Sequence, residues 1–413
     1  MKKKTIFFAA LFFFIIHFSS AQDLLSSLLK ERTSLVTQKV IANKRKYRLQ
    51  IIYTQVNRDK NNVPSFKQYS MGLDDEEYFY PASLVKLPTI ALALEKLDSL
   101  NIPGLNKYSR VKIDSAYQCQ KPVLYDSTAK DNYPSIAHYV KKMLLVSDNN
   151  AYNRLFEFLG PEYINRHLAK MGYGNAGIFH RLSFPCEPIT NCYTNPFTFF
   201  DASGKAVYQQ PLTVCPKLYS NPLEPKVGKG FMNEKRRLVK QPKDFSQNNY
   251  LPLSTINSVL VSLFFPLAVE SKKRFNLTDD DYTFIYKYMQ MYPRESDYPF
   301  YDEKKYPDNY KKYYESDTVY KKITEDSVRI FNVVGLAYGF MSDCSYIVNI
   351  DKKIEFFLST VIYVNENNVI NSGRYEYYRT GFPFLTDLEK TIYNYEFSRN
   401  KEYPPNFSNF KFR

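Results

Sequence analysis

Ser83 and Lys86 stand three residues apart, directly before the long apolar run 87–94. If this stretch begins a helix, one turn places the two side chains on the same face. A serine hydroxyl is a weak nucleophile until a base removes its proton, and a neighbouring lysine can do so when burial and nearby positive charge lower its pKa. The spacing therefore predicts a serine nucleophile activated by Lys86. The alternative interpretation is a helix N-cap at Ser83 followed by a solvated charge.

The pair must be judged by its context, because the same spacing recurs at Ser27 to Lys30 and at Ser408 to Lys411. Only Ser83 lies at a predicted strand-to-helix junction. Further along, Ser147-Asp148-Asn149 interrupts a helical pattern. Its hydroxyl, carboxylate and amide can supply a proton relay, an internal brace and a hydrogen-bond donor to a substrate, although the triplet alone is also typical of a loop with a helix cap. The joint occurrence of the two motifs favours a catalytic site.

The elements that must position these residues follow from hydrophobic periodicity. Alternation of period two predicts strands, which are expected at 48–56, 67–71, 328–338, 345–349 and 354–364. Helical spacing marks the segments 84–97, 135–146, 151–159, 162–171, 254–269, 279–291 and 384–398. Strands at both ends that enclose a helical middle predict an α+β fold, in which one antiparallel sheet is built from the two termini beside a mostly helical lobe. Residues 22–413 then form a single domain, with surface insertions expected near 208–250 and 293–325.

The N-terminus predicts export. Residues 1–21 combine three lysines, the apolar run 6–18 and small residues at Ser19 and Ala21, which is typical of a secretory signal peptide cleaved after Ala21. The alternative, a membrane anchor, is disfavoured because the run is shorter than the roughly 20 residues that span a bilayer. We expect a periplasmic or secreted protein with no stable membrane span after cleavage. The formal net charge of +14 falls to +11 without the three lysines of this N-terminal segment, and the rest is dispersed, which gives no indication of nucleic-acid binding.

The cysteines and histidines bear on disulfides and metals. In an exported chain the five cysteines could form two disulfides and leave one thiol; they are Cys119, Cys186, Cys192, Cys215 and Cys344. Their spacings fit no zinc motif. The three histidines after residue 21 are far apart and lack a metal-binding frame. We therefore expect no metal and no cofactor.

Ser-x-x-Lys followed by Ser-Asp-Asn resembles the class A β-lactamase and penicillin-binding-protein superfamily of serine acyl-enzymes. The continuation 149–155 is similar as well, including Asn153 four residues after Asn149. The resemblance spans about residues 47–398. It implies a β-lactamase/transpeptidase-like fold, with a five-stranded antiparallel sheet from both termini and an all-helical lobe. It also implies that Ser83 is acylated, that Lys86 activates it, and that Ser147 relays a proton to the leaving nitrogen, while Asn149 binds the substrate's side-chain amide.

Class A members also carry a glutamate, followed four residues later by an asparagine, on a loop after the Ser-Asp-Asn motif. Glu187 and Asn191 have this spacing, and Arg181 is placed to anchor such a loop. The resemblance implies that Glu187 activates the deacylating water and that Asn191 helps to position it. The alternative is an ordinary loop glutamate, since Glu187 comes a few residues late and lies between two cysteines.

The third motif of the family, Lys-Thr/Ser-Gly, is not intact. The best match is the segment 331–339, in which Gly335 is retained as a substrate-binding position but the lysine and the hydroxyl are absent. Loss of that lysine removes a cation that would bind the substrate carboxylate. Candidates to replace it are Arg329, Arg374 and Arg379. The oxyanion hole would be made by backbone N–H groups of Ser83 and of a residue within 334–337.

These features lead to a primary hypothesis and three alternatives. The primary hypothesis is a serine acyl-enzyme hydrolase that opens β-lactam amides through acyl-Ser83. The alternatives are a peptidoglycan D-Ala-D-Ala carboxypeptidase, another amide or ester hydrolase, and a non-catalytic cell-wall-binding relative. The expected partner is a small-molecule β-lactam or a peptidoglycan stem peptide.

Overall fold

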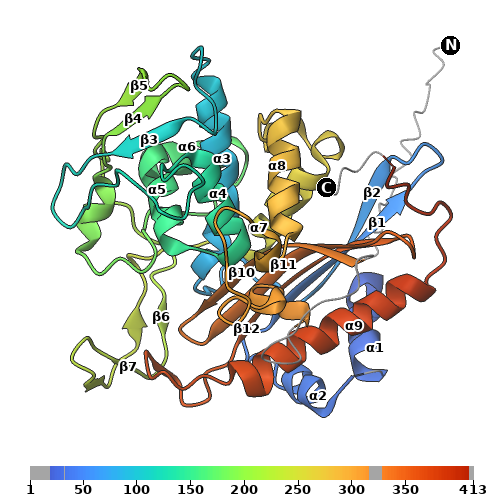
Figure 1. The fold of residues 1–413 in the computed structure, drawn as a ribbon. Helices are drawn as coiled ribbons and strands as arrows, with labels where there is room; N and C mark the ends of the chain where they lie inside the picture. The colour runs from blue at the N-terminus through green and yellow to red at the C-terminus, as the bar shows by residue number, and fades with distance from the viewer. Residues whose placement is uncertain (1–18, 32, 316–327, 409–413) are drawn as a thin grey trace, which may run out of the picture.

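The computed structural model describes residues 19–31, 33–315 and 328–408, and its centre is a five-stranded antiparallel sheet (Figure 1). The strands are β1 (Gln50–Arg58), β2 (Pro64–Met71), β10 (Val328–Ala337), β11 (Phe340–Asn349) and β12 (Ile354–Tyr363). Their order is β10-β11-β12-β1-β2. The N-terminal hairpin joins the C-terminal strands through β1 and β12, where Gln50 lies opposite Val361. This confirms the predicted sheet built from both termini.

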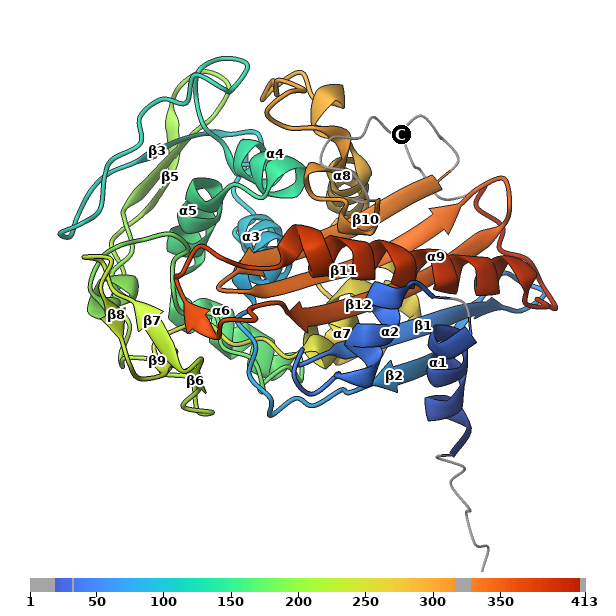
Figure 2. The same cartoon turned by 90° about the horizontal axis from the view of Figure 1, so that it is seen from below.

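Helices cover both faces of this sheet. On one face lie α1 (Ser19–Glu31), α2 (Leu35–Ala42) and α9 (Phe382–Ser398), as Figure 2 shows. On the other face lie α7 (Leu253–Phe264) and α8 (Asp279–Gln290). Successive side chains of a strand point to opposite faces, so Ile51 packs into the core under α9 while Ile52 packs into the core on the other side. Burial on both faces explains why β11 and β12 are apolar along most of their length.

The second lobe carries four of the predicted helices and a three-stranded sheet. Its helices are α3 (Lys86–Ser99), α4 (Ile136–Val146), α5 (Asn149–Leu159) and α6 (Pro161–Lys170). The expectation of an all-helical lobe is wrong in one respect, because β3 (Arg110–Ile113), β4 (Phe197–Phe200) and β5 (Ala206–Gln210) form a three-stranded sheet beside them. Phe197 and Phe199 alternate into the lobe's core. These strands are too short for their period to stand out in the sequence.

The two expected insertions behave differently. The stretch 208–250 carries four short strands, which are β6 (Lys226–Val227), β7 (Gly230–Met232), β8 (Leu238–Val239) and β9 (Lys243–Asp244). Of the stretch 293–325, only residues up to 315 are described. It contains the 3₁₀ turns η5 (Pro293–Glu295), η6 (Asp308–Tyr310) and η7 (Tyr313–Glu315), and residues 311–314 are buried rather than on the surface. The predicted signal peptide falls largely on residues 1–18, outside the described residues.

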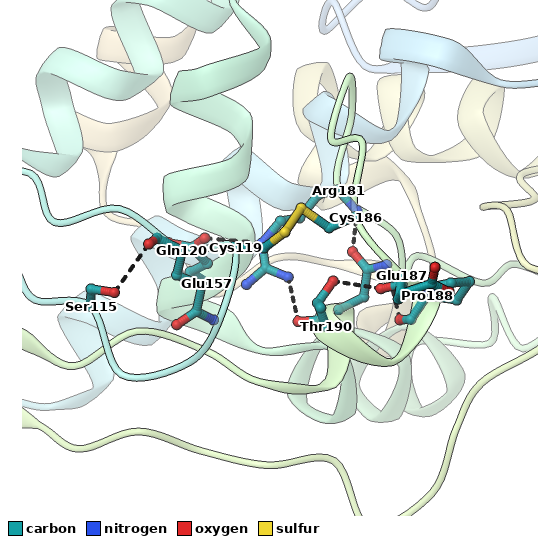
Figure 3. The surroundings of a disulfide bond; sticks show 10 residues. Ser115, Cys119, Gln120, Glu157, Arg181, Cys186, Glu187, Pro188 and Thr190 are labelled. Atoms are coloured by element: carbon teal, nitrogen blue, oxygen red, sulfur yellow. Dashed lines mark hydrogen bonds and ion pairs between the residues drawn. A yellow bond between two sulfur atoms is a disulfide. The ribbon is translucent and has the colours of Figure 1, made fainter. Parts of the chain in front are cut away.

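One disulfide joins Cys119 to Cys186 in the described part of the chain, and Figure 3 shows it beside the loop that carries Arg181 and Glu187. The remaining cysteines, Cys192, Cys215 and Cys344, are free thiols. One bridge is therefore formed where the cysteine count allowed two. Among the described residues, no helix is both long and apolar enough to cross a membrane.

Candidate active site

The predicted nucleophile and base lie together where the 3₁₀ turn η1 (Ala82–Val85) leads into α3. Lys86 Nζ lies 2.8 Å from Ser83 Oγ. Ala82, immediately before the serine, has a φ of 46°, which is the left-handed region that residues with a Cβ rarely adopt. Such strain at a turn beside a nucleophile is typical of functional sites. The turn fixes Ser83 at the entrance to the helix while Lys86 is held inside.

The Ser-Asp-Asn triplet closes around the same lysine. Ser147 ends α4 with a φ of 57°, and Asp148 caps α5 by accepting a hydrogen bond from the backbone N–H of Ala151 at 2.8 Å. This sharp reversal aims two side chains at Lys86: Nζ lies 3.0 Å from Ser147 Oγ and 2.7 Å from Asn149 Oδ1. Nζ also donates to the backbone oxygen of Ser147. Four oxygens therefore surround the amine, one of them the candidate nucleophile.

Burial sets the protonation of Lys86. Its side chain is 1% exposed, and desolvation lowers its pKa well below the ordinary value of a lysine. The nearby carboxylate of Asp148 works in the opposite direction, whereas the ammonium of Lys311 lowers the pKa further. A neutral lysine amine has a free lone pair and can accept the proton of the Ser83 hydroxyl.

A cavity of about 380 Å³ opens onto Ser83. Its polar wall contains Ser83, Ser147, Asn149, Lys305, Asn309 and Lys311, and its other walls are Val146, Pro307, Tyr310, Tyr313, Val334, Leu336, Tyr378 and Phe382. Tyr310 and Tyr378 are partly exposed at its rim. None of these described lining residues is an aspartate or a glutamate. The cavity combines the Ser83 hydroxyl, two lysines and an apolar rim.

Gly335 lies where β10 approaches the turn η1 most closely. A Cβ at this position would lie 2.7 Å from the backbone oxygen of Pro81 and 2.5 Å from Ser342 Oγ, both closer than a carbon can come. The glycine therefore lets the strand contact the turn that carries Ser83. Because β10 is an edge strand of the sheet, one side of its backbone has no partner strand among the described residues, as the predicted oxyanion hole requires.

The loop with Glu187 and Asn191 is held together by its own hydrogen bonds. Arg181 anchors it as expected: the guanidinium pairs with Glu157 at 2.9 Å and donates to the backbone oxygens of Thr190 and Tyr193 at 2.8 and 2.7 Å. Figure 3 shows Arg181 between Glu157 and Thr190, with Glu187 at the far side of the loop. Asn191 Oδ1 accepts from the backbone N–H of Arg181 at 2.8 Å. The amide of Asn191 thus holds the loop together.

Glu187 is exposed and, like Asn191, is not among the described residues that line the cavity. The structure brings Ser83, Lys86, Ser147, Asn149 and the backbone of Gly335 together and leaves these two apart. Asn149 Nδ2 instead meets the loop at Ser183, whose Oγ accepts from it at 2.8 Å.

The three arginines considered as substitutes for the third-motif lysine do not line the cavity either. Arg374 is exposed, and Arg379 pairs with Glu366 at 2.6 Å. The residue that sequence reasoning missed is Lys311, which comes from the expected insertion and faces the cavity beside Ser83. The only signal available was two adjacent lysines in an aromatic stretch before β10, and that pattern is also typical of a surface loop.

Comparison with known proteins agrees with this geometry. A sequence model of the β-lactamase enzyme family matches residues 36–201, the segment that carries Ser83, Lys86 and the Ser-Asp-Asn triplet. Among solved structures, a β-lactamase from Sphaerobacter thermophilus is 9% identical over 91% of this chain and 97% of its own, with a TM-score of 0.48. A β-lactamase from Desulfarculus baarsii is 12% identical over 90% and 97%, with a TM-score of 0.45. No curated protein sequence gives a significant match. The matched segment supplies the serine, its lysine and the triplet around them, and over these residues the chain is similar to the β-lactamase enzyme family.

Proposed function

We propose that this protein is a serine acyl-enzyme that opens β-lactam amides through an ester on Ser83. The observation that carries the proposal is the buried amine of Lys86, 2.8 Å from Ser83 Oγ. Burial lowers the pKa of Lys86 and so favours the neutral form that a base requires.

The geometry suits the following order in which bonds form and break. Lys86 Nζ takes the Ser83 proton while Oγ attacks the amide carbonyl carbon. The negative charge that develops on the carbonyl oxygen is met by backbone N–H groups of Ser83 and of the edge strand β10 near Gly335. Collapse breaks the carbon–nitrogen bond, and the proton held on Lys86 returns through Ser147 Oγ, 3.0 Å away, to the leaving nitrogen. The product is acyl-Ser83 with both side chains restored.

The second candidate function differs in the fate of that ester. None of the described residues that line the cavity carries a carboxylate, so no general base other than Lys86 is evident for a deacylating water. This favours a long-lived acyl-enzyme, as in a peptidoglycan carboxypeptidase or another amide or ester hydrolase that β-lactams would inhibit. Retention of the Lys86 cluster argues against a non-catalytic cell-wall-binding relative.

The deciding experiment is intact-mass measurement of the protein during incubation with a penicillin. We expect a mass increase equal to one penicillin, located on Ser83 by peptide mapping and absent in Ser83→Ala. The matched control is Ser27→Ala, since Ser27 is exposed and precedes Lys30 at the same spacing. Labelling of any serine other than Ser83 would refute the proposal. An adduct lost within seconds indicates a lactamase, and one retained for hours indicates the second candidate.

We further propose that the protein works in the periplasm or outside the cell, on the basis of the N-terminal pattern. N-terminal sequencing of protein from the native host should begin at Gln22. Retention of residues 1–21 on membrane-extracted protein would contradict this.

A further inference from the structure

A second buried lysine faces the cavity from outside all three sequence motifs. Lys311 lies between η6 and η7, its side chain is 3% exposed, and it lines the cavity together with Ser83 and Ser147. The ammonium of this residue is close enough to Lys86 to lower the pKa of that group.

The hydrogen bonds of Lys311 are incomplete, in contrast to those of its neighbour. Lys312 Nζ donates to the backbone oxygens of Met289 and Ile330 and to Asn332 Oδ1. Lys311 Nζ has one partner among the described residues, the backbone oxygen of Asn332 at 3.0 Å. An ammonium has three N–H donors. Two donors of a nearly fully buried group therefore remain for whatever occupies the cavity, and an unmet buried donor is costly.

A buried carboxyl group acts on both lysines. This group is Asp343, which accepts hydrogen bonds from Ser345 Oγ at 2.6 Å and from Asn332 Nδ2. Burial raises the pKa of Asp343 to about 7 and lowers that of Lys311 to about 7. In this dry environment an anion bound in the cavity would favour the charged form of Lys311.

The strand next to the serine cannot supply this cation. At the matching segment of β10, Val333 is buried in the core and Val334 lines the cavity. The loop that precedes β10 in the chain brings Lys311 to the same cavity. From this position Lys311 can donate an ionic hydrogen bond to an anionic group of a substrate whose carbonyl group lies at Ser83.

We propose that Lys311 binds a carboxylate of the acyl donor and so makes the enzyme specific for anionic substrates. This assignment rests on the proposed acylation of Ser83 and identifies the class of substrate that reaches it. Charge-assisted hydrogen bonds are the strong ones, and loss of one typically weakens binding by about 10- to 100-fold.

The test compares benzylpenicillin with its neutral methyl ester in two proteins that cannot be acylated, Ser83→Ala and Ser83→Ala with Lys311→Met. Calorimetry should show that Ser83→Ala binds the acid at least about tenfold more tightly than the ester. Lys311→Met should abolish this preference and leave ester binding unchanged, whereas Lys311→Arg should retain it because arginine keeps the charge. The matched control is Lys304→Met, an exposed lysine that does not line the cavity, and this variant should keep the preference.

Equal binding of acid and ester by Ser83→Ala, or an unchanged preference after Lys311→Met, would overturn the assignment of Lys311. Melting temperatures of all variants separate these results from unfolding. The measurement needs no chemistry at Ser83, so it can fail while acylation of the wild type is observed, and it can succeed when acylation is not.

The pH dependence provides a second readout. The groups that face Lys311 are Lys86 on α3, Lys312, Tyr310, Tyr313 and Asp343 on β11. Because the pKa of Lys311 is near 7 in the empty cavity, the preference for the acid should decline as the pH rises above neutrality, and in Lys311→Arg it should not. If Ser83→Ala with Lys311 intact prefers the acid to the same extent at every pH, this result would count against the assignment of Lys311.

Discussion

Replacing Lys86 by methionine tests the chemistry of the site most directly. Methionine is close to lysine in length and flexibility but has no amine, so the substitution removes the base and retains most of the packing. It withdraws the nitrogen that lies 2.8 Å from Ser83 Oγ and 3.0 Å from Ser147 Oγ. Both the activation of the nucleophile and the return of the proton should therefore fail.

We expect Lys86→Met to slow acylation strongly and to change the free energy of unfolding only a little. Positioned general bases contribute about 10²- to 10⁴-fold, so the rate of acylation should fall by that factor, equal to about 3–5 kcal/mol in the barrier. The folded state gains from the loss of a buried amine, because a lysine whose pKa is lowered on folding binds its proton more tightly in the unfolded chain. Lost hydrogen bonds oppose this gain, and the free energy of unfolding should change by no more than about 2 kcal/mol.

The assay is the rate of adduct formation with benzylpenicillin, followed by mass spectrometry from pH 5 to pH 9. The wild-type rate should rise with pH as Lys86 loses its proton, and its upper plateau should be reached below the ordinary lysine pKa, since burial lowers that of Lys86. In Lys86→Met this rise should disappear.

Lys96→Met is the matched control. Lys96 lies on the same helix, burial lowers its pKa to about 8, and its Nζ donates to Gln210 Oε1 at 2.8 Å, away from the cavity. This variant should acylate at the wild-type rate. A Lys86→Met protein that is labelled as fast as the wild type, or a Lys96→Met protein that is equally impaired, would refute the assignment of Lys86 as the base.

Three further predictions concern the loop, the strand and the disulfide. Glu187→Gln should leave the lifetime of the acyl-enzyme unchanged, because Glu187 is exposed and does not line the cavity; accumulation of the adduct in a pulse–chase experiment would return Glu187 to the catalytic role that the sequence predicted. Gly335→Ala should lower the free energy of unfolding by about 1–3 kcal/mol and slow acylation, since its Cβ would collide with the turn before Ser83; denaturant titration with wild-type values would contradict this. Thiol titration of the denatured, unreduced chain should find three free cysteines, and Cys119→Ser should lower stability by about 2–4 kcal/mol because the bridge closes a long loop. Five reactive thiols would show that the bridge does not form.

Much of the fold was predictable because its signals are local. The three C-terminal strands alternate or are continuously apolar, and helices carry their own caps, as Thr278 does where it begins α8 with a complete capping box. The limits of β11 were less clear. The strand begins at Phe340 rather than near Ser345, because Ser342 and Asp343 look like loop residues. In the folded protein Asp343 is buried and hydrogen-bonded by Asn332, a partner eleven residues earlier in the chain that no local pattern reveals.

The same distinction applies to the site. The sequence by itself determined the pairing of Ser83 with Lys86, because three residues along a helix fix two side chains on one face whatever surrounds them. It also indicated the triplet that encloses the lysine, because serine, aspartate and asparagine are residue types that favour a sharp turn between two helices. The positions of Glu187 and Lys311 relative to Ser83 depend on how long loops pack across the sheet. Loop conformation is set by distant contacts such as Arg181 with Glu157 and Lys311 with Asn332, so only the tertiary structure decided that the glutamate lies outside the cavity and that the lysine lies within it.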